Sequence, residues 1–226
     1  MSNDVYTEID RNHFRQRLLK YTRKAFNLLP RMDRPSILDV GCGSGVPTIE
    51  LARLSKGTVV GIDIDQSLLD ELNRKIERED LSNRVETSRC SMLALGFLDE
   101  SFEIIWFEGA IRAIGFEKAL NEWRRLLKPN GFLVIHDEVK TVAKKLQKIP
   151  SLGYRLTNHF LLPKDVWWIE YYAPLEKRVK RLYEKYKNNL QALRMLEEVQ
   201  TEIDMVKGNP KKYRSAFYIM QKKRSL

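Results

Sequence analysis

Three glycines alternate with single residues in the segment ILDVGCGSGVPTIELA, residues 37–52, at positions Gly41, Gly43 and Gly45. An apolar run precedes this turn, and apolar residues with helical spacing follow it. Glycine lets the backbone approach a ligand closely, and the N-terminus of a helix favours an anion. The pattern therefore predicts a binding site for a small molecule that carries an anionic group.

The spacing departs from the dinucleotide fingerprint G-x-G-x-x-G, whose third glycine packs the helix on the strand around a pyrophosphate. That third position holds Val46, and Pro47 after it suits the first turn of a helix. Asp63 ends the next apolar stretch, where a carboxylate can accept hydrogen bonds from both ribose hydroxyls. We therefore expect a ligand with a ribose, an adenine-like ring and a carboxylate but no pyrophosphate, a description that S-adenosylmethionine fits better than a dinucleotide.

His136 is the best candidate for a general base. It ends an apolar stretch at the edge where open parallel sheets bind ligands, and imidazole exchanges protons near neutral pH. The alternative is a buried, hydrogen-bonded histidine with a structural role, and Glu108 and Glu138 are weaker base candidates.

The two cysteines, Cys42 and Cys90, have neither disulfide-framework nor metal-ligand spacing. We expect no metal, a small filler role for Cys42 in the glycine turn, and an inert thiol at Cys90. This cysteine usage favours a reducing, cytoplasmic setting.

The chain has 226 residues, is 43% hydrophobic and carries a formal net charge of +10. Residues 36–138 hold 12 basic and 18 acidic side chains, whereas residues 139–226 hold 20 and 8. This asymmetry is explained either by solvated helical surfaces or by an acidic partner such as RNA, a phosphorylated metabolite or a membrane surface. The polar, acidic N-terminus predicts no signal peptide, and no apolar stretch approaches the roughly 20 residues of a membrane span.

Short apolar strands alternate with amphipathic helices along the chain, which predicts a doubly wound α/β fold with a parallel sheet. We expect strands at 36–40, 59–62, 84–88, 102–107, 132–136, 154–162 and 213–221, with helices at 10–29, 46–54, 66–79, 116–127, 175–187 and 190–207. The residues at 128–131 are expected to form a turn, and the last two helices form an insertion between the sixth and seventh strands.

Residues 36–138 resemble the class I S-adenosylmethionine-dependent methyltransferases. The segments that carry the resemblance are ILDVGCGSG, VVGIDID, SFEIIWFEGAI and EWRRLLKPNGFLVIHDE, similar to the family's first, second, fourth-strand and fifth-strand motifs. The likeness is greatest to the small-molecule branch that includes quinone-biosynthesis enzymes. FEGAIRAIGFEKAL and LLPKDVWWIEYYAP resemble a poorly characterised microbial subgroup of that branch.

The resemblance implies a single Rossmann-like domain over residues 1–226. Its seven strands would have the order 3-2-1-4-5-7-6, with strand seven antiparallel. Residues 1–35 would form a helical lid, residues 36–138 the cofactor-binding core, and residues 139–226 the acceptor-side strands and the helical insertion.

The resemblance also implies roles for individual residues. The positions implied to contact S-adenosylmethionine, or its product S-adenosylhomocysteine, are Asp39, Gly41, Cys42, Gly43, Gly45, Asp63, Ile64, Ser91, Met92, Glu108 and Gly109. The resemblance implies that the methionine end is held by Asp39, Gly41, Gly43 and Gly45. Asp63 would hold the ribose, and Ile64 would cover one face of the adenine. Ser91 and Met92 take the adenine position, where the family often has Asp, and Glu108 and Gly109 border the methyl group.

Methyl transfer from a sulfonium is an in-line displacement with a neutral leaving group. The protein must mainly align the reactants, and it needs a base only for a protonated acceptor. A small-molecule acceptor is the expected substrate. Its pocket is implied to include Trp167, Trp168, Tyr171 and Tyr172, which could equally pack the insertion onto the sheet.

Three rivals remain. An RNA methyltransferase would use the basic segment EKRVKRLYEKYK, residues 176–187, although the Pro-Pro and Pro-Cys signatures of nucleic-acid enzymes are absent after the fourth strand. A protein (lysine) methyltransferase is barely discriminated by the sequence. A scaffold that binds the cofactor without turnover is disfavoured because the three glycines and Asp63 are intact.

Overall fold

The computed structural model describes residues 2–109 and 114–223, which form two compact units. The sheet unit comprises residues 21–109, 114–161 and 215–223, and the helical unit comprises residues 2–20 and 162–214. Residues 110–113, in the middle of the FEGAIRAIGFEKAL segment, lie outside the described residues. The assignment of the whole chain to one domain with a lid stays a prediction.

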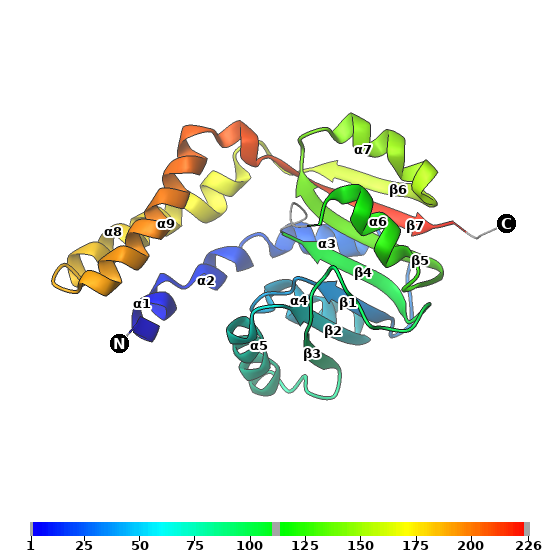
Figure 1. The fold of residues 1–226 in the computed structure, drawn as a ribbon, viewed down its shortest axis with the longest axis horizontal. Coiled ribbons are helices and arrows are strands. Elements are labelled where there is room, and N and C mark those ends of the chain that lie inside the picture. The colour runs from blue at the N-terminus through cyan, green and yellow to red at the C-terminus, as the bar shows by residue number, and fades with distance from the viewer. Residues whose placement is uncertain (1, 110–113, 224–226) are drawn as a thin grey trace. The chain divides into compact units, whose positions relative to one another are not determined.

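The sheet unit is built on one seven-stranded sheet (Figure 1). Its strands are β1 (Ser36–Val40), β2 (Thr58–Asp63), β3 (Val85–Arg89), β4 (Phe102–Glu108), β5 (Leu127–Glu138), β6 (Tyr154–Leu161) and β7 (Ser215–Lys222). The order is β3-β2-β1-β4-β5-β7-β6. Strands β1 to β5 pair in parallel, and β7 pairs antiparallel with both β5 and β6. The predicted order and the reversed seventh strand are confirmed.

Helices cover both faces of this sheet. The elements on one face are α3 (Leu19–Asn27), α4 (Val46–Ser55) and α5 (Gln66–Arg78), and those on the other are α6 (Phe116–Arg124), α7 (Val142–Lys148) and the 3-10 turn η2 (Ile149–Leu152). On the first face Phe26 of α3 packs on Trp106 at 6.4 Å between ring centroids. On the second face Trp123 of α6 belongs to a buried cluster with Phe107 and Ile135. Burial on both faces explains the continuous apolar runs of the central strands.

The parallel register brings the functional positions to one edge of the sheet. Asp39 is paired with Gly61, and Glu108 is paired with His136. The carboxyl ends of β1, β2, β4 and β5 therefore lie along the same edge, which is where open α/β sheets bind ligands.

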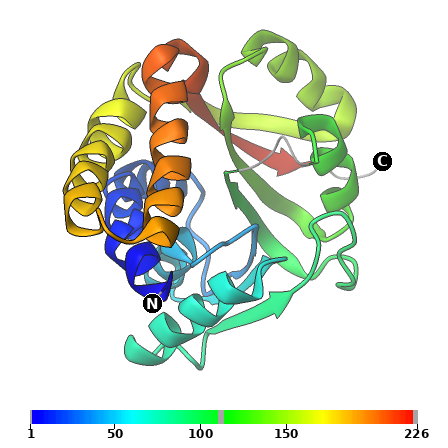
Figure 2. The ribbon, with the colours of Figure 1, turned by 60° about the vertical axis from the view of Figure 1, so that its left-hand side comes forward.

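The helical unit contains α1 (Ser2–Ile9), α2 (Arg11–Gln16), the π-helix η3 (Trp167–Tyr172), α8 (Ala173–Lys185), α9 (Leu190–Gly208) and the 3-10 turn η4 (Pro210–Tyr213). Figures 1 and 2 show α8 and α9 side by side, and they join β6 to β7 as the predicted insertion. Ion pairs tie α1 and α2 to α8: Lys185 to Glu8 at 2.6 Å and Arg178 to Asp10 at 3.1 Å.

The prediction of one helix over 10–29 is wrong. Asp10 has a left-handed φ of 49° and caps α2 by accepting a hydrogen bond from the His13 N–H. A second break follows α2, where the Leu18 N–H bonds to the carbonyl of Arg15, three residues back. The chain divides here because Phe14 packs within the helical unit, whereas the residues after Lys20 belong to the sheet unit.

Smaller differences concern α7 and the segment at 128–131. Helix α7 was not predicted because it is short and has no fully buried residue. The predicted turn lies inside the bounds of β5, but the pairing with β4 shifts register there, from Phe102 with Leu127 to Ile104 with Phe132. The turn chemistry is still present, since Asn130 has a φ of +62°.

Candidate functional site

The glycine turn follows β1 and leads into α4. All three glycines have left-handed backbone, with φ of +67° at Gly41, +54° at Gly43 and +81° at Gly45. The Cys42 N–H reaches the carbonyl of Ile62 at 2.9 Å, which fixes the turn against the end of β2. A positive φ at three alternating positions explains the spacing that the sequence shows, because side chains with a Cβ rarely adopt it.

The three glycines face different surroundings. A Cβ on Gly45 would lie 2.1 Å from Cδ1 of Leu72, so this glycine lets α5 pack against the start of α4. A Cβ on Gly41 would make ordinary contact, at 3.7 Å, with Met92 and Phe107. A Cβ on Gly43 would meet nothing within 4 Å. Open space at Gly43 is the room that a ligand needs to approach the backbone.

Asp63 ends β2 and joins the turn to it. Its Oδ2 accepts a hydrogen bond from the Gly43 N–H at 2.9 Å, and its Oδ1 accepts one from the Asp65 N–H at 3.0 Å. The side chain is only partly buried. Because each carboxylate oxygen has two lone pairs, both oxygens keep a position for a further donor, as a ribose with two hydroxyls requires.

Asp39 lies one residue before the end of β1 and is buried. Its Oδ2 accepts a hydrogen bond from the Thr48 hydroxyl of α4 at 2.6 Å. This bond ties the strand to the helix that follows the glycine turn. The observed contact is the one expected of a satisfied strand-end carboxylate, and a role for Asp39 toward a ligand stays a prediction.

The residues predicted to surround an adenine lie beside Asp63. Ile64 is an exposed apolar side chain, with 65% of its surface accessible. The Cys90 N–H bonds to the Asp63 carbonyl at 3.1 Å, which places Ser91 and Met92 next to the end of β2. The Ser91 hydroxyl accepts from the Leu93 N–H at 3.2 Å, and Met92 packs against the buried cluster of the α6 face.

Glu108 and His136 occupy paired positions at the ends of β4 and β5. Glu108 Oε1 accepts hydrogen bonds from the Thr22 hydroxyl at 2.7 Å and from the Trp106 indole N–H at 2.9 Å. Gly109 has a φ of +144°, and a Cβ there would meet no atom within 4 Å. The end of β4 therefore presents an anchored carboxylate followed by a glycine with open space at its Cβ position.

The His136 side chain is buried and held from two sides. Its Nε2 lies 2.8 Å from the Ser215 hydroxyl, and its ring stacks on Phe217 with centroids 4.4 Å apart and an angle of 8°. This packing fixes the ring orientation, which suits either a structural histidine or a positioned base. Ser215 and Thr22 were not singled out from the sequence, because only the antiparallel β7 and helix α3 bring them to His136 and Glu108.

The predicted acceptor aromatics belong to the helical unit and pack there. The Tyr172 hydroxyl donates to Glu202 at 3.0 Å, and Arg11 donates to the Tyr171 hydroxyl at 3.4 Å. Burial raises the pKa of both tyrosines. Trp167 and Trp168 each lie beneath a cation, Arg15 and Lys207 respectively. Their packing role is observed, and their role toward an acceptor stays a prediction.

Neither cysteine has the environment of a nucleophile. Burial raises the pKa of the Cys42 thiol, and the nearby carboxylates of Asp39 and Asp63 raise it further. Burial also raises the pKa of Cys90. Thiolates carry the reactivity of cysteine, so the raised pKa lowers the reactivity of both thiols.

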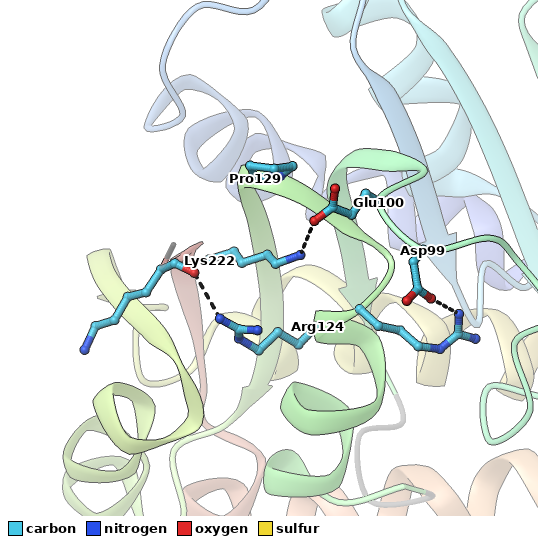
Figure 3. A pocket seen from close by; sticks show the side chains of 7 residues that line it. Asp99, Glu100, Arg124, Pro129 and Lys222 are labelled. Carbon is cyan, nitrogen blue, oxygen red and sulfur yellow. Dashed lines mark hydrogen bonds and ion pairs between the residues drawn. The ribbon is translucent and has the colours of Figure 1, made fainter. Parts of the chain in front are cut away.

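The opposite edge of the sheet has a hollow of about 610 Å³ near Arg124, Lys222 and Glu100 (Figure 3). Its charged groups are already paired: Lys222 Nζ lies 3.4 Å from Glu100, and Arg124 donates to the Lys223 carbonyl at 2.9 Å. Because it lies at the amino ends of β4 and β5, it is remote from the glycine turn.

No group of three or more His, Cys, Asp or Glu side chains in residues 2–109 and 114–223 is arranged to hold a metal ion. None of the helices in these ranges has both the length and the apolar character of a membrane span.

Comparison with known proteins finds a family match over part of the chain. Residues 37–131 match a family described as "Methyltransferase domain". The chain is 33% identical over 136 residues to an uncharacterised protein of Haemophilus influenzae, covering 58% of this chain and 54% of that protein. It is 31% identical over 150 residues to demethylmenaquinone methyltransferase of Bacteroides fragilis, covering 61% of each. The matched region thus spans about half to three fifths of these relatives.

Among solved structures, an S-adenosylmethionine-dependent methyltransferase from Thiobacillus denitrificans in complex with S-adenosylhomocysteine has the same fold. The TM-score is 0.74 at 17% identity, over 90% of this chain and 91% of that one. The glycine turn and the Asp63 contact lie within residues 37–131, the part of the chain that matches the family. In its motifs and strand order the chain is similar to the class I S-adenosylmethionine-dependent methyltransferases, and residues 37–131 match the family of methyltransferase domains.

Proposed function

We propose that this protein transfers a methyl group from S-adenosylmethionine to a small-molecule acceptor. The observation that carries the proposal is the Gly43–Asp63 contact, which combines open space over a glycine turn with a carboxylate that retains acceptor positions. A ribose with two hydroxyls and a methionine carboxylate match these two features.

The residues beside the turn fit the remaining parts of this cofactor. We assign the methionine end to Asp39, Gly41, Gly43 and Gly45, with Cys42 between them, and the ribose to Asp63. We assign the adenine to Ile64, Ser91 and Met92. Glu108 and Gly109 are assigned to the border of the methyl group. The exposed Ile64 side chain offers an apolar surface to one adenine face. When bound, the cofactor supplies a methyl group on a positively charged sulfur.

The chain's own contribution is alignment and, for a protonated acceptor, removal of a proton. Alignment alone supplies effective molarities of roughly 10⁵ M or more in favourable cases. His136 is the proposed base, with its ring held by Ser215 and Phe217. The aromatics Trp167, Trp168, Tyr171 and Tyr172 are proposed to contact the acceptor. The small-molecule class is supported by relatives such as the demethylmenaquinone methyltransferase.

The basic surface of α8 supports RNA or protein as the alternative acceptor. Lys177 and Arg181 are exposed on α8, and within the described ranges neither forms an ion pair. Unpaired cations on one helix would contribute salt-dependent binding to a polyanion.

The test uses methyl-labelled S-adenosylmethionine, purified protein and a host-cell extract separated into small-molecule, RNA and protein fractions. We expect label in the small-molecule fraction with the wild-type protein and none with Asp63→Ala. Label in RNA or protein would replace the proposed acceptor with the alternative one. No label in any fraction, with S-adenosylhomocysteine binding demonstrated, would overturn the proposed transfer activity.

A further inference from the structure

A second hollow lies between α6 and α7, on the face of the sheet opposite to His136. It has a volume of about 400 Å³, and the residues that define its charge are Glu117, Lys118, Lys144, Lys145 and Lys148, with Gly115 at its margin. Since α6 follows β4 and α7 follows β5, the hollow lies at the same sheet edge as the glycine turn. Hollows of this size commonly hold small molecules.

Two of the four lysines already have carboxylate partners. Lys145 is partly buried, forms an ion pair with the buried Asp137 and donates to the Glu138 carbonyl at 2.9 Å. Lys148 is paired with Glu117 at the exposed rim. These contacts hold two ammonium groups at the hollow and leave no acidic side chain to neutralise the others.

Lys118 and Lys144 are the remaining cations. Both are exposed, and neither has a carboxylate within ion-pair distance among the described residues. The segment 139–164 holds six basic side chains and no acidic one, so the sequence also offers no local partner. Two uncompensated positive charges at one hollow favour the binding of an anion there.

The start of α6 adds hydrogen-bond donors to this positive field. Gly115 precedes the nine-residue helix without a side-chain cap and with a φ of +85°, and a Cβ on it would meet nothing within 4 Å. The first N–H groups of a helix have no partner within the helix, and its dipole favours a negative charge there. Lysine ammonium groups and such N–H groups are together the donors that proteins offer to phosphate.

We propose that the hollow between α6 and α7 binds the phosphate or diphosphate group of a small phosphorylated molecule. Its volume exceeds that of a phosphate alone, so the hollow also has room for part of the carbon skeleton. This inference goes beyond methyl transfer, because binding there depends on the lysines of α6 and α7 and on none of the residues assigned to the cofactor.

The test measures binding of inorganic diphosphate by calorimetry at low and high salt. The variant Lys118→Gln/Lys144→Gln removes the two unpaired cations, and Lys177→Gln/Arg181→Gln removes two exposed cations from α8 as the matched control. We expect the wild type and the control to bind with similar affinity, and the α6–α7 variant to bind about tenfold more weakly or worse. The affinity should fall as salt screens the charges.

A wild-type protein that does not bind diphosphate, or an equal loss in both variants, would overturn the proposal. Lys118→Arg/Lys144→Arg keeps the charges and should retain binding. S-adenosylhomocysteine affinity should be unchanged in the α6–α7 variant. Diphosphate binding tests the hollow between α6 and α7, whereas S-adenosylhomocysteine binding tests the cofactor site that the proposed methyl transfer needs. A failure of one proposal can therefore be distinguished from a failure of the other.

Discussion

The Asp63 carboxylate accepts a hydrogen bond from the backbone N–H of Gly43 across 2.9 Å. The acidic residue at the end of β2 therefore holds the glycine turn at the end of β1 in place. A change at either residue is expected to disturb both the shape of the turn and the acceptor positions for a ribose.

The first prediction concerns this carboxylate. Asp63→Asn should weaken S-adenosylhomocysteine binding about 10- to 100-fold, because hydrogen bonds to a charged group contribute about 1.5–3 kcal/mol. Calorimetric titration measures the change. Asp70→Asn, an exposed carboxylate on α5 that bonds to Gln66, is the matched control and should leave the affinity unchanged. Equal affinities for all three proteins would refute the ribose assignment.

The second prediction separates two glycines of the same turn. Gly45→Ala should lower the free energy of unfolding by about 2–4 kcal/mol, because the new methyl group meets Leu72 in a strained backbone conformation. Gly43→Ala should cost only about 1–2 kcal/mol of stability, because its Cβ enters open space, but it should impair ligand binding. Urea denaturation and calorimetry together distinguish the two effects, and identical stability losses would contradict this account of the turn.

The third prediction concerns His136. If it acts as the base, His136→Gln should reduce kcat by about 10²–10⁴ while leaving S-adenosylhomocysteine affinity unchanged. Ser215→Ala should cause a smaller loss and change the pH profile of kcat, since it removes a hydrogen-bond partner of Nε2. His159→Gln, at an exposed position on β6, is the control. Full activity of His136→Gln toward the labelled acceptor would exclude a role as base.

The fourth prediction uses the raised pKa of the cysteines. Because the Cys42 thiol stays protonated, it should resist a thiol-specific reagent at pH 8 in the folded protein and react fully only after denaturation. Lowering the pH cannot increase its reactivity, since the thiolate fraction decreases further. Cys90, which is only partly buried, should react before Cys42. Mass spectrometry of wild type and Cys42→Ala identifies the modified residue, and rapid labelling of Cys42 would contradict the assignment as a filler.

The fifth prediction compares two ion pairs of α7. Lys145→Met should destabilise the fold by about 3–5 kcal/mol, because it leaves the buried Asp137 carboxylate without its partner. Lys148→Met breaks the exposed pair with Glu117 and should change stability by less than about 1 kcal/mol. Equal effects in urea denaturation would show that the Asp137–Lys145 pair contributes no more to stability than the exposed Lys148–Glu117 pair.

Most of the sheet could be predicted from local sequence because its signals are local. The apolar run before Gly41 and the alternation of short strands with amphipathic helices specify β1 to β5 and their covering helices. The order of β6 and β7 was expected from the resemblance alone, since periodicity carries no information about which strands pair. The helix over 10–29 was mispredicted for a related reason: a continuous apolar pattern does not reveal that its two halves pack in different units.

The sequence by itself determined the glycine turn, Asp63 and the parallel core, because a left-handed backbone and a strand-end carboxylate require particular residue types at a fixed spacing. Only the tertiary structure decided that Ser215 holds His136, that Thr22 holds Glu108, and that two unpaired lysines from α6 and α7 line one hollow. Ser215 lies 79 positions from His136 and Thr22 lies 86 from Glu108. Contacts over such separations arise from strand pairing and helix packing, and local residue patterns do not encode them.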